Sequence, residues 1–233
     1  MNNKTVAILK FFKDKDNLDY LLSGGFYCNT PEFYRMSKNE GVSDVNESCL
    51  QSYRSKRGDK PIELRINGEV IEGIDNLTVQ NKSLKDRYLH CWFAIRIPET
   101  NEDLEEFTRS INRMRSEFGE NYAFIRMGNV STLVKRLGKN TTSKIDYGNV
   151  VYSKDPTEWS VACKSTEYSY QQEYRFLVGN CDHTDTKPFE IVCDQRLDDL
   201  IDYNQNLEIK NKETGHTLFF LDSTQCYFNI DIE

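Results

Sequence analysis

The chain lacks the short sequence patterns that mark several large enzyme classes. Its three histidines, His90, His183 and His216, lie far apart, and none stands near a cysteine at metal-ligand spacing. The phosphate-cradling loops G-x-x-x-x-G-K-[ST] and G-x-G-x-x-G are absent, and so is the G-x-S-x-G turn of serine hydrolases. We therefore expect no metal site and none of the standard nucleotide loops.

Long hydrophobic runs and paired cysteines are also missing. No apolar stretch approaches the ~20 residues that a membrane helix needs, and the first residues, MNNKTVAILKFF, show neither the long apolar run nor the cleavage site of a signal peptide. The seven cysteines are odd in number and form no C-x-x-C pair. We expect a cytoplasmic protein that makes no membrane contact and whose thiols are reduced, mostly as small core residues.

Positive charge is in deficit, because the net charge is -7 at pH 7. This balance argues against nucleic acid as the partner. Hydrophobic residues make up 38% and charged residues 29% of the 233 residues, which is typical of a globular chain. With no internal repeat and no linker, we expect one domain over residues 1–233. Residues 38–60 are polar and contain Gly41 and Gly58, so they are interpreted as a long surface loop.

The hydrophobic pattern predicts more strands than helices, without strict alternation of the two. The clearest helix is predicted over residues 101–119, with Asn101 as its cap and Leu104, Phe107, Ile111, Met114 and Phe118 as its apolar stripe. Hairpins are predicted around Asn67-Gly68 and around Glu213-Thr214-Gly215. Strands are predicted over residues 6–12, 26–28, 88–97, 122–127, 145–153, 173–178, 189–193 and 225–230. The pattern indicates an α+β fold with a mostly antiparallel or split mixed sheet and a few helices.

The stretch KSTEYSYQQEYRFLVG, residues 164–179, is the most informative part of the chain. In its strand, Tyr174, Phe176 and Val178 fall on one face and should meet the core. Glu173 and Arg175 fall on the opposite face, beside Gln171. Two interpretations stay open: a plain cross-sheet ion pair, or polar groups that hold a ligand or carry out chemistry.

Two short segments carry a family resemblance. Near the start, Gly24-Gly25-Phe26-Tyr27 is followed by Asn29-Thr30-Pro31; later come Lys164, Tyr168 and Gln171-x-Glu173-x-Arg175. Together they resemble a group of bacterial and phage domains of unknown function, often found near defence genes, which implies a role in phage–host conflict. More distantly, the layout resembles the ADP-ribosyltransferase fold, whose (Q/E)-x-E triplet is similar to Gln171-Gln172-Glu173.

The resemblance implies a site and a cofactor. In such transferases the second acid, here Glu173, contacts the nicotinamide ribose of NAD and stabilises a cation-like transition state, while the residue two positions earlier, here Gln171, orients the acceptor. The acceptor would be a protein or a nucleotide-like molecule. The further ligand-binding residues that we expect are Lys10, Tyr27, Thr30, Tyr34, Arg35, Lys164 and Arg175. Lys10 is the only polar residue of the early strand ILKFF.

The same residues also allow a non-catalytic interpretation. Two interpretations are open for Tyr27, Phe33, Tyr34 and Arg35: they are either core and rim of a small subdomain or the walls of a slot in which a base or nicotinamide stacks. Lys164 either binds a ligand or covers Tyr168 with its alkyl stem. On this second hypothesis the protein is a binding protein, which uses its acidic surface and residues 38–60 to engage a protein partner or a nucleotide signalling molecule.

Overall fold

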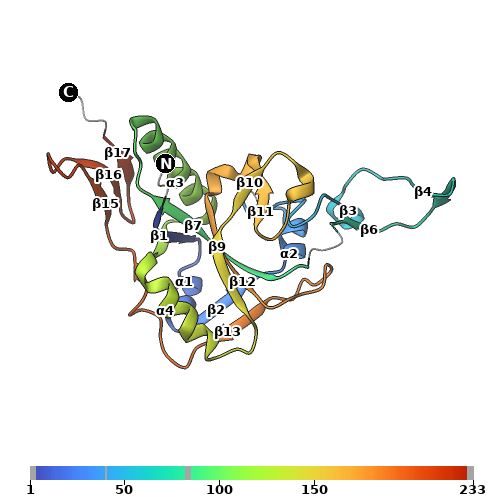
Figure 1. Ribbon diagram of the computed structural model, residues 1–233, viewed down its shortest axis with the longest axis horizontal. Coiled ribbons are helices and arrows are strands. Elements are labelled where there is room, and N and C mark those ends of the chain that lie inside the picture. Colours follow the sequence, from blue (N-terminus) through green and yellow to red (C-terminus); the bar gives the residue numbers. More distant parts are fainter. Residues whose placement is uncertain (1–3, 40, 82–84, 230–233) are drawn as a thin grey trace.

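The structure is a computed structural model that describes residues 4–39, 41–81 and 85–229. Its central element is a six-stranded sheet in which every neighbouring pair of strands is antiparallel (Figure 1). In spatial order the strands are β14 (Asp202–Tyr203), β8 (Asn121–Arg126), β1 (Thr5–Phe12), β7 (Tyr88–Arg96), β12 (Glu173–Val178) and β9 (Ile145–Asn149). The predicted α+β class with a mostly antiparallel sheet is confirmed.

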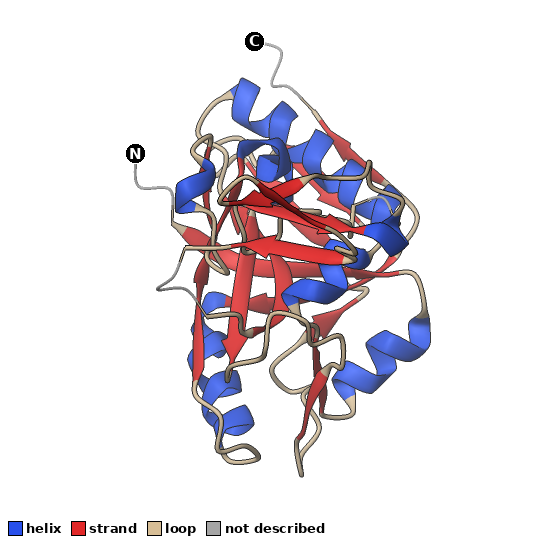
Figure 2. Ribbon diagram, turned by 90° about the vertical axis from the view of Figure 1, so that its right-hand side faces the viewer, coloured by secondary structure: helices blue, strands red, loops and turns tan. Residues whose placement is uncertain are grey.

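Both faces of this sheet are covered, because the strands β8, β1 and β7 carry apolar side chains on both sides. On β1, Ile8 and Phe12 point into one core, whereas Leu9 and Phe11 point into the other. Figure 2 shows the strands in the middle of the molecule, with helices at the upper and lower ends of the view. Two separate cores, one for each face of the sheet, therefore hold the domain together.

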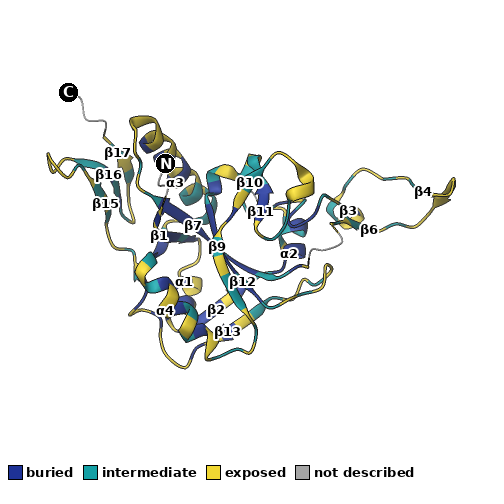
Figure 3. Ribbon diagram, in the orientation of Figure 1, coloured by how far each residue is buried: buried dark blue, intermediate teal, exposed yellow. Residues whose placement is uncertain are grey.

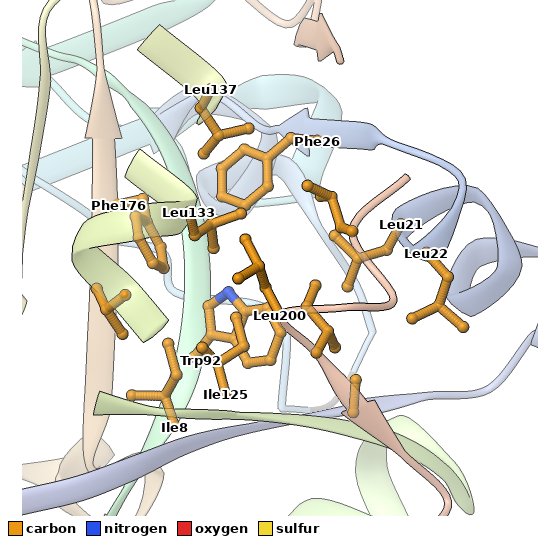
Figure 4. Packing of buried hydrophobic residues seen from close by; sticks show 14 of the residues in the cluster. Ile8, Leu21, Leu22, Phe26, Trp92, Ile125, Leu133, Leu137, Phe176 and Leu200 are labelled. Carbon is orange, nitrogen blue, oxygen red and sulfur yellow. The ribbon is translucent and has the colours of Figure 1, made fainter. Parts of the chain in front are cut away.

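The first core lies under two helices and a two-stranded ribbon. These elements are α1 (Lys15–Leu22), α4 (Met127–Gly138) and the pair β2 (Gly25–Cys28) and β13 (Phe189–Val192). Figure 4 shows Trp92 and Phe176 of the sheet packed among leucines of both helices. The alternation predicted for the 173–178 strand is confirmed on this side, because Tyr174, Phe176 and Val178 are all buried here.

The second core lies under the long helix α3 (Asn101–Phe118) and a three-stranded sheet. That sheet contains β15 (Leu207–Lys210), β16 (Thr217–Leu221) and β17 (Cys226–Phe228), and its first hairpin is the predicted one. The expected cap of α3 is wrong by one residue: Thr100 Oγ1 accepts the Asp103 N–H at 3.1 Å, and Asp103 in turn accepts the Thr100 N–H. Gly119 ends the helix with φ +108°, and a Cβ at this position would lie 2.4 Å from the Phe12 carbonyl oxygen, which is too close for any other residue.

The segment expected to be a long surface loop is partly structured and partly buried. It contains β3 (Gln51–Arg54), which pairs with β6 (Asn76–Val79), and a 3-10 turn, η1 (Ser55–Arg57). Asp44, Glu47 and Cys49 are each at most 4% exposed. The reason is electrostatic, because the two carboxylates turn inward to meet buried cations described below.

The remaining elements are short. The predicted Asn67-Gly68 hairpin is confirmed as β4 (Leu64–Ile66) and β5 (Glu69–Ile71), which project from the body of the molecule and are exposed (Figure 3). α2 (Pro31–Met36) follows β2. After β9 come β10 (Val151–Ser153), the 3-10 turn η2 (Pro156–Glu158), β11 (Cys163–Ser165) and the 3-10 turn η3 (Thr166–Gln171), with β10 and β11 parallel.

The central sheet divides between β1 and β7. These strands pair from Thr5–Arg96 only as far as Leu9–Phe93. Beyond this point β1 continues along β8 to Phe12, while β7 continues along β12 to Tyr88. Beyond Leu9 and Phe93, β1 and β7 are therefore no longer paired with each other. Side chains occupy the space between the two strands there.

Candidate functional site

A cavity of about 270 Å³ lies on the α3 side of the sheet, where β1 and β7 diverge. Its floor is formed by β1, β7 and β12, and its walls by α2, by the last turns of α3 and by residues 39, 41, 42 and 47. Part of the lining is apolar, with Leu9, Phe93, Met114 and Phe118 among its members. The rest is largely polar and includes six of the residues that the sequence singles out.

Glu173 stands at the polar end of this cavity, opposite Phe93 in the strand register. The residue is 6% exposed, and its carboxylate has two cationic partners: Lys164 Nζ donates to Oε1 at 2.8 Å, and Arg175 Nε donates to Oε2 at 2.6 Å. Burial raises the pKa of Glu173, but the charges of Arg175 and Lys164 outweigh burial and hold the pKa well below its ordinary value. Glu173 is therefore ionised at neutral pH, and its charge is balanced.

Lys164 and Arg175 extend the ion pair into a buried cluster. The Arg175 guanidinium donates to both carboxylate oxygens of Glu47, at 2.8 Å each. Lys164 Nζ lies 3.4 Å from Asp44 and 3.6 Å from Glu47, and it lies over the Tyr168 ring at 4.4 Å. Bidentate arginine pairs fix geometry as well as charge. The cluster thus ties residues 44–47, at the edge of the cavity, to the strand that forms its floor.

Asp44 is the carboxylate of the cluster that is least stabilised in its ionised form. Burial and the neighbouring charge of Glu47 raise the pKa of Asp44 to about 6, although Lys164 pulls it the other way. With Asp44 ionised, three carboxylates face two cations; with Asp44 protonated, the cluster is neutral. The charge at the polar end therefore changes near pH 6.

Gln171 connects the cluster to the roof of the cavity. Its Oε1 accepts from Lys164 at 2.9 Å, while its Nε2 donates to the Gly41 carbonyl at 2.8 Å and to Tyr170 Oη at 3.3 Å. Gly41 has φ +76° and packs so closely on α3 that a Cβ there would meet Glu117 at 2.3 Å. The amide of Gln171 is thus held in one orientation, as a site residue must be.

Lys10 lies at the divergence of the strands and differs from Lys164. Its Nζ donates to the Cys91 carbonyl at 2.8 Å, and no carboxylate of the described residues is within ion-pair distance. Burial lowers the pKa of Lys10. A second cavity of about 280 Å³, on the α1 side of the sheet, is also lined by Lys10, together with Tyr27, Tyr34 and His90. Lys10 therefore borders cavities on both faces of the divided sheet.

The structure brings six of the predicted site residues to the first cavity. They are Lys10, Tyr34, Lys164, Gln171, Glu173 and Arg175. Tyr27 lines only the second cavity and is 41% exposed. Thr30 is fully buried and caps α2, since its Oγ1 accepts the Phe33 N–H at 3.1 Å.

Arg35 lies away from both cavities, in a second buried network. Its guanidinium donates to Glu32 at 2.8 Å, to Asp86 at 3.0 Å and to the Glu47 carbonyl at 2.7 Å. Glu32 also pairs with Arg54 on β3, at 2.6 Å. Arg35 thus fastens α2 to the neighbouring segments. The two networks meet at Glu47, whose backbone accepts from Arg35 and whose side chain accepts from Arg175.

Sequence reasoning missed two members of the site, Asp44 and Glu47. Both lie in a polar stretch without hydrophobic periodicity, so no spacing in the chain marks them as buried. Met114 and Phe118 of α3 were predicted as core, and they do pack against the second core, but they also line the cavity. A helix stripe does not reveal which of its members border an open space.

Two classes of site find no support in the part of the chain that the structure describes. No group of three or more His, Cys, Asp or Glu side chains there is arranged to hold a metal ion. No helix within the described ranges is long and apolar enough to cross a membrane. Comparison with protein-family models, curated proteins and solved structures gives no match for this chain.

Proposed function

We propose that this protein binds a small nucleotide-like ligand in the cavity where β1 and β7 diverge. The observation that carries the proposal is the mixed lining, which combines apolar side chains with a hydrogen-bonded cluster of buried charged groups. Ligand sites of proteins are mostly apolar, with a few fixed polar groups that set orientation, and begin at roughly 300 Å³. A cavity of about 270 Å³ lies just below this range, so its ligand would be small, of mononucleotide size at most.

The lining suggests how such a ligand would lie. Phe33, Tyr34 and Phe118 offer aromatic surface for a flat base or ring. Each oxygen of Glu173 accepts one hydrogen bond from the protein, and a carboxylate has about four acceptor positions, so free positions remain for ribose hydroxyls. Because its partners already fix Glu173, little ordering is needed when the ligand binds, which favours affinity.

Thermal unfolding with a panel of nucleotides tests the proposal. AMP, nicotinamide mononucleotide, ADP-ribose and NAD are each added to the wild-type protein. A ligand present at 100 times its Kd stabilises the folded state by about 2.7 kcal/mol. At roughly 2–4 °C per kcal/mol, this raises Tm by about 5–11 °C. Val42→Trp, which places a large ring in the cavity lining, should remove the shift. Val45→Trp is the matched control, because Val45 lies on the same segment but is 41% exposed and outside the lining. No shift with any nucleotide would contradict the proposal.

ADP-ribosyl transfer from NAD is the second candidate. It is favoured by one observation, that Gln171 and Glu173 line the same cavity, as the family resemblance implies. Against it stands the charge balance of Glu173, because a carboxylate paired with two cations has less negative potential left for a developing oxocarbenium ion. The direct assay is release of nicotinamide from NAD by the wild-type protein. If no release occurs while nucleotides still raise Tm, binding without transfer is the function.

The hypothesis of a protein partner engaged by residues 38–60 loses part of its basis. Asp44 and Glu47 point into the molecule, so this segment does not present them to a partner. The role in phage–host conflict stays a prediction from the resemblance alone.

A further inference from the structure

We propose that Lys10 acts as an amine nucleophile, which forms an imine with a small aldehyde or ketone entering the divided sheet. In the described part of the chain, three features are combined only in this lysine: it borders two cavities, its hydrogen-bond partner is a neutral carbonyl, and it has no carboxylate within ion-pair distance. The inference does not depend on the nucleotide ligand proposed above.

The position of Lys10 follows from the strand pairing. The last β1–β7 pair is Leu9–Phe93, so Lys10 is the first residue of β1 without a partner on β7. Its Nζ donates to the Cys91 carbonyl, a backbone group that the divided ladder leaves available. Lys10 remains partly exposed, and it borders the cavity on each face of the sheet. A small carbonyl compound in either cavity would therefore lie beside Lys10.

The surroundings of Lys10 favour the neutral amine. Desolvation penalises an ammonium, and only a nearby negative charge offsets that penalty. Lys164 shows the opposite case in the same cavity, since Glu173, Asp44 and Glu47 surround its ammonium and stabilise it. Among the described residues no carboxylate lies within 4 Å of Lys10 Nζ. Burial lowers the pKa of Lys10 and outweighs Cys91, Cys28 and Glu173, which favour its ammonium. Lysines activated for Schiff-base chemistry are desolvated in this way.

The reaction is balanced without any further reagent. The nitrogen lone pair of neutral Lys10 forms a bond to the carbonyl carbon, and the C=O π electrons move to oxygen to give a carbinolamine. Both protons of the amine leave with that oxygen as water, and the C=N bond of the imine forms. Hydrolysis reverses the sequence and restores the lysine.

Site-resolved reductive ethylation tests the inference on the wild-type protein. Acetaldehyde and cyanoborohydride are added between pH 6 and pH 10, and the modification rate of each lysine is followed by mass spectrometry. Lys139, which is exposed at the end of α4, is the surface reference, and Lys164 is the buried control. Lys10 should react severalfold faster than Lys139 at pH 7 and reach half its maximal rate at a lower pH. Lys164 should stay unmodified in the folded protein.

Lys10→Arg is the control for the reactive residue. Arginine keeps a cation at the position but forms no imine under these conditions, so the fast-reacting site should vanish. The labelling reaction contains no nucleotide, so its outcome is independent of any nucleotide-dependent rise in Tm. If Lys10 in the wild type reacts no faster than Lys139 at pH 7, or if the two rates rise in parallel with pH, the inference is wrong. Loss of the Tm rise alone would concern only the nucleotide site.

Discussion

Replacing Glu173 by Gln removes the negative charge that Lys164 and Arg175 share, while it leaves the side-chain shape almost unchanged. Both cations stay behind in a buried position, with side chains that are 6% and 3% exposed. Removing one partner of a buried pair typically costs 3–5 kcal/mol, because the other charge is left without compensation. Glu47 and Asp44 still face the two cations, so we expect the lower part of that range, about 3 kcal/mol.

The assay is urea unfolding with a parallel thermal scan. For a chain of this length 1 kcal/mol changes Tm by roughly 2–4 °C, so about 3 kcal/mol lowers it by about 6–12 °C. Glu63→Gln is the matched control, because Glu63 pairs with Arg65 at 2.6 Å while both side chains are more than half exposed. Exposed pairs contribute at most ~1 kcal/mol. The urea m-value should be unchanged, which shows that the same surface is exposed on unfolding.

The pH dependence gives a second, independent readout of the same reasoning. The pKa of Glu173 is lowered in the folded state, so its stabilisation is complete above the unfolded value of 4.5 and is lost as the pH falls below it. The stability difference between wild type and Glu173→Gln should therefore shrink in acid. If Glu173→Gln loses less than 1 kcal/mol at pH 7, or if the difference does not shrink below pH 4.5, the buried ion cluster does not have the role described here.

Three further changes test the surroundings of the cavity. Asp44→Asn should become more stable relative to wild type by about 3 kcal/mol as the pH rises from about 4 to about 7, because the pKa of Asp44 is raised to about 6 from the model-peptide value of 3.8. Urea unfolding at several pH values in this range measures the difference in stability. A difference that does not change with pH would contradict the prediction. Arg35→Lys should destabilise by about 3 kcal/mol through lost charged hydrogen bonds, against less than ~1 kcal/mol for Arg65→Lys in an exposed pair. Thr30→Ala should cost about 1 kcal/mol by uncapping α2, and Thr30→Ser should restore most of it in the same unfolding assay.

The fold could be predicted largely because its strongest signals are local. The period of α3, the alternation of β12 and the two hairpin turns each depend on residues close together in the chain. The exact ends of the helices are harder to predict from local signals. Thr100 and Asn101 are both suitable N-caps for α3, and the reciprocal hydrogen bonds with Asp103 show that Thr100 is the cap. Strand order and the point where β1 leaves β7 depend on pairs some eighty residues apart, such as Leu9 with Phe93, which no local pattern encodes.

The site was predictable on the strand but not on the segment that covers it. Alternation alone puts Glu173 and Arg175 on one face, and the structure places both of them at the cavity. Asp44 and Glu47 are acids in a polar stretch, where the ordinary expectation is exposure. Their burial follows from the cations of β11 and β12, more than a hundred residues away. Arg35 is the opposite case. Its guanidinium was expected to bind a ligand, but it forms ion pairs with Glu32 and Asp86 inside the protein.

The two interpretations of Glu173, ion pair and ligand group, are not exclusive in this structure. Glu173 lines the cavity and also forms ion pairs with Lys164 and Arg175. Arg175 in turn pairs with Glu47. The Glu47 carbonyl also accepts a hydrogen bond from Arg35 of α2. A substitution at Glu173 can therefore alter the position of α2 through the two connected networks of buried charged groups. Loss of binding or turnover in a Glu173 variant is therefore ambiguous by itself. Only a loss of function that exceeds the fraction unfolded at the assay temperature assigns Glu173 to the ligand, and this is why its stability must be measured first.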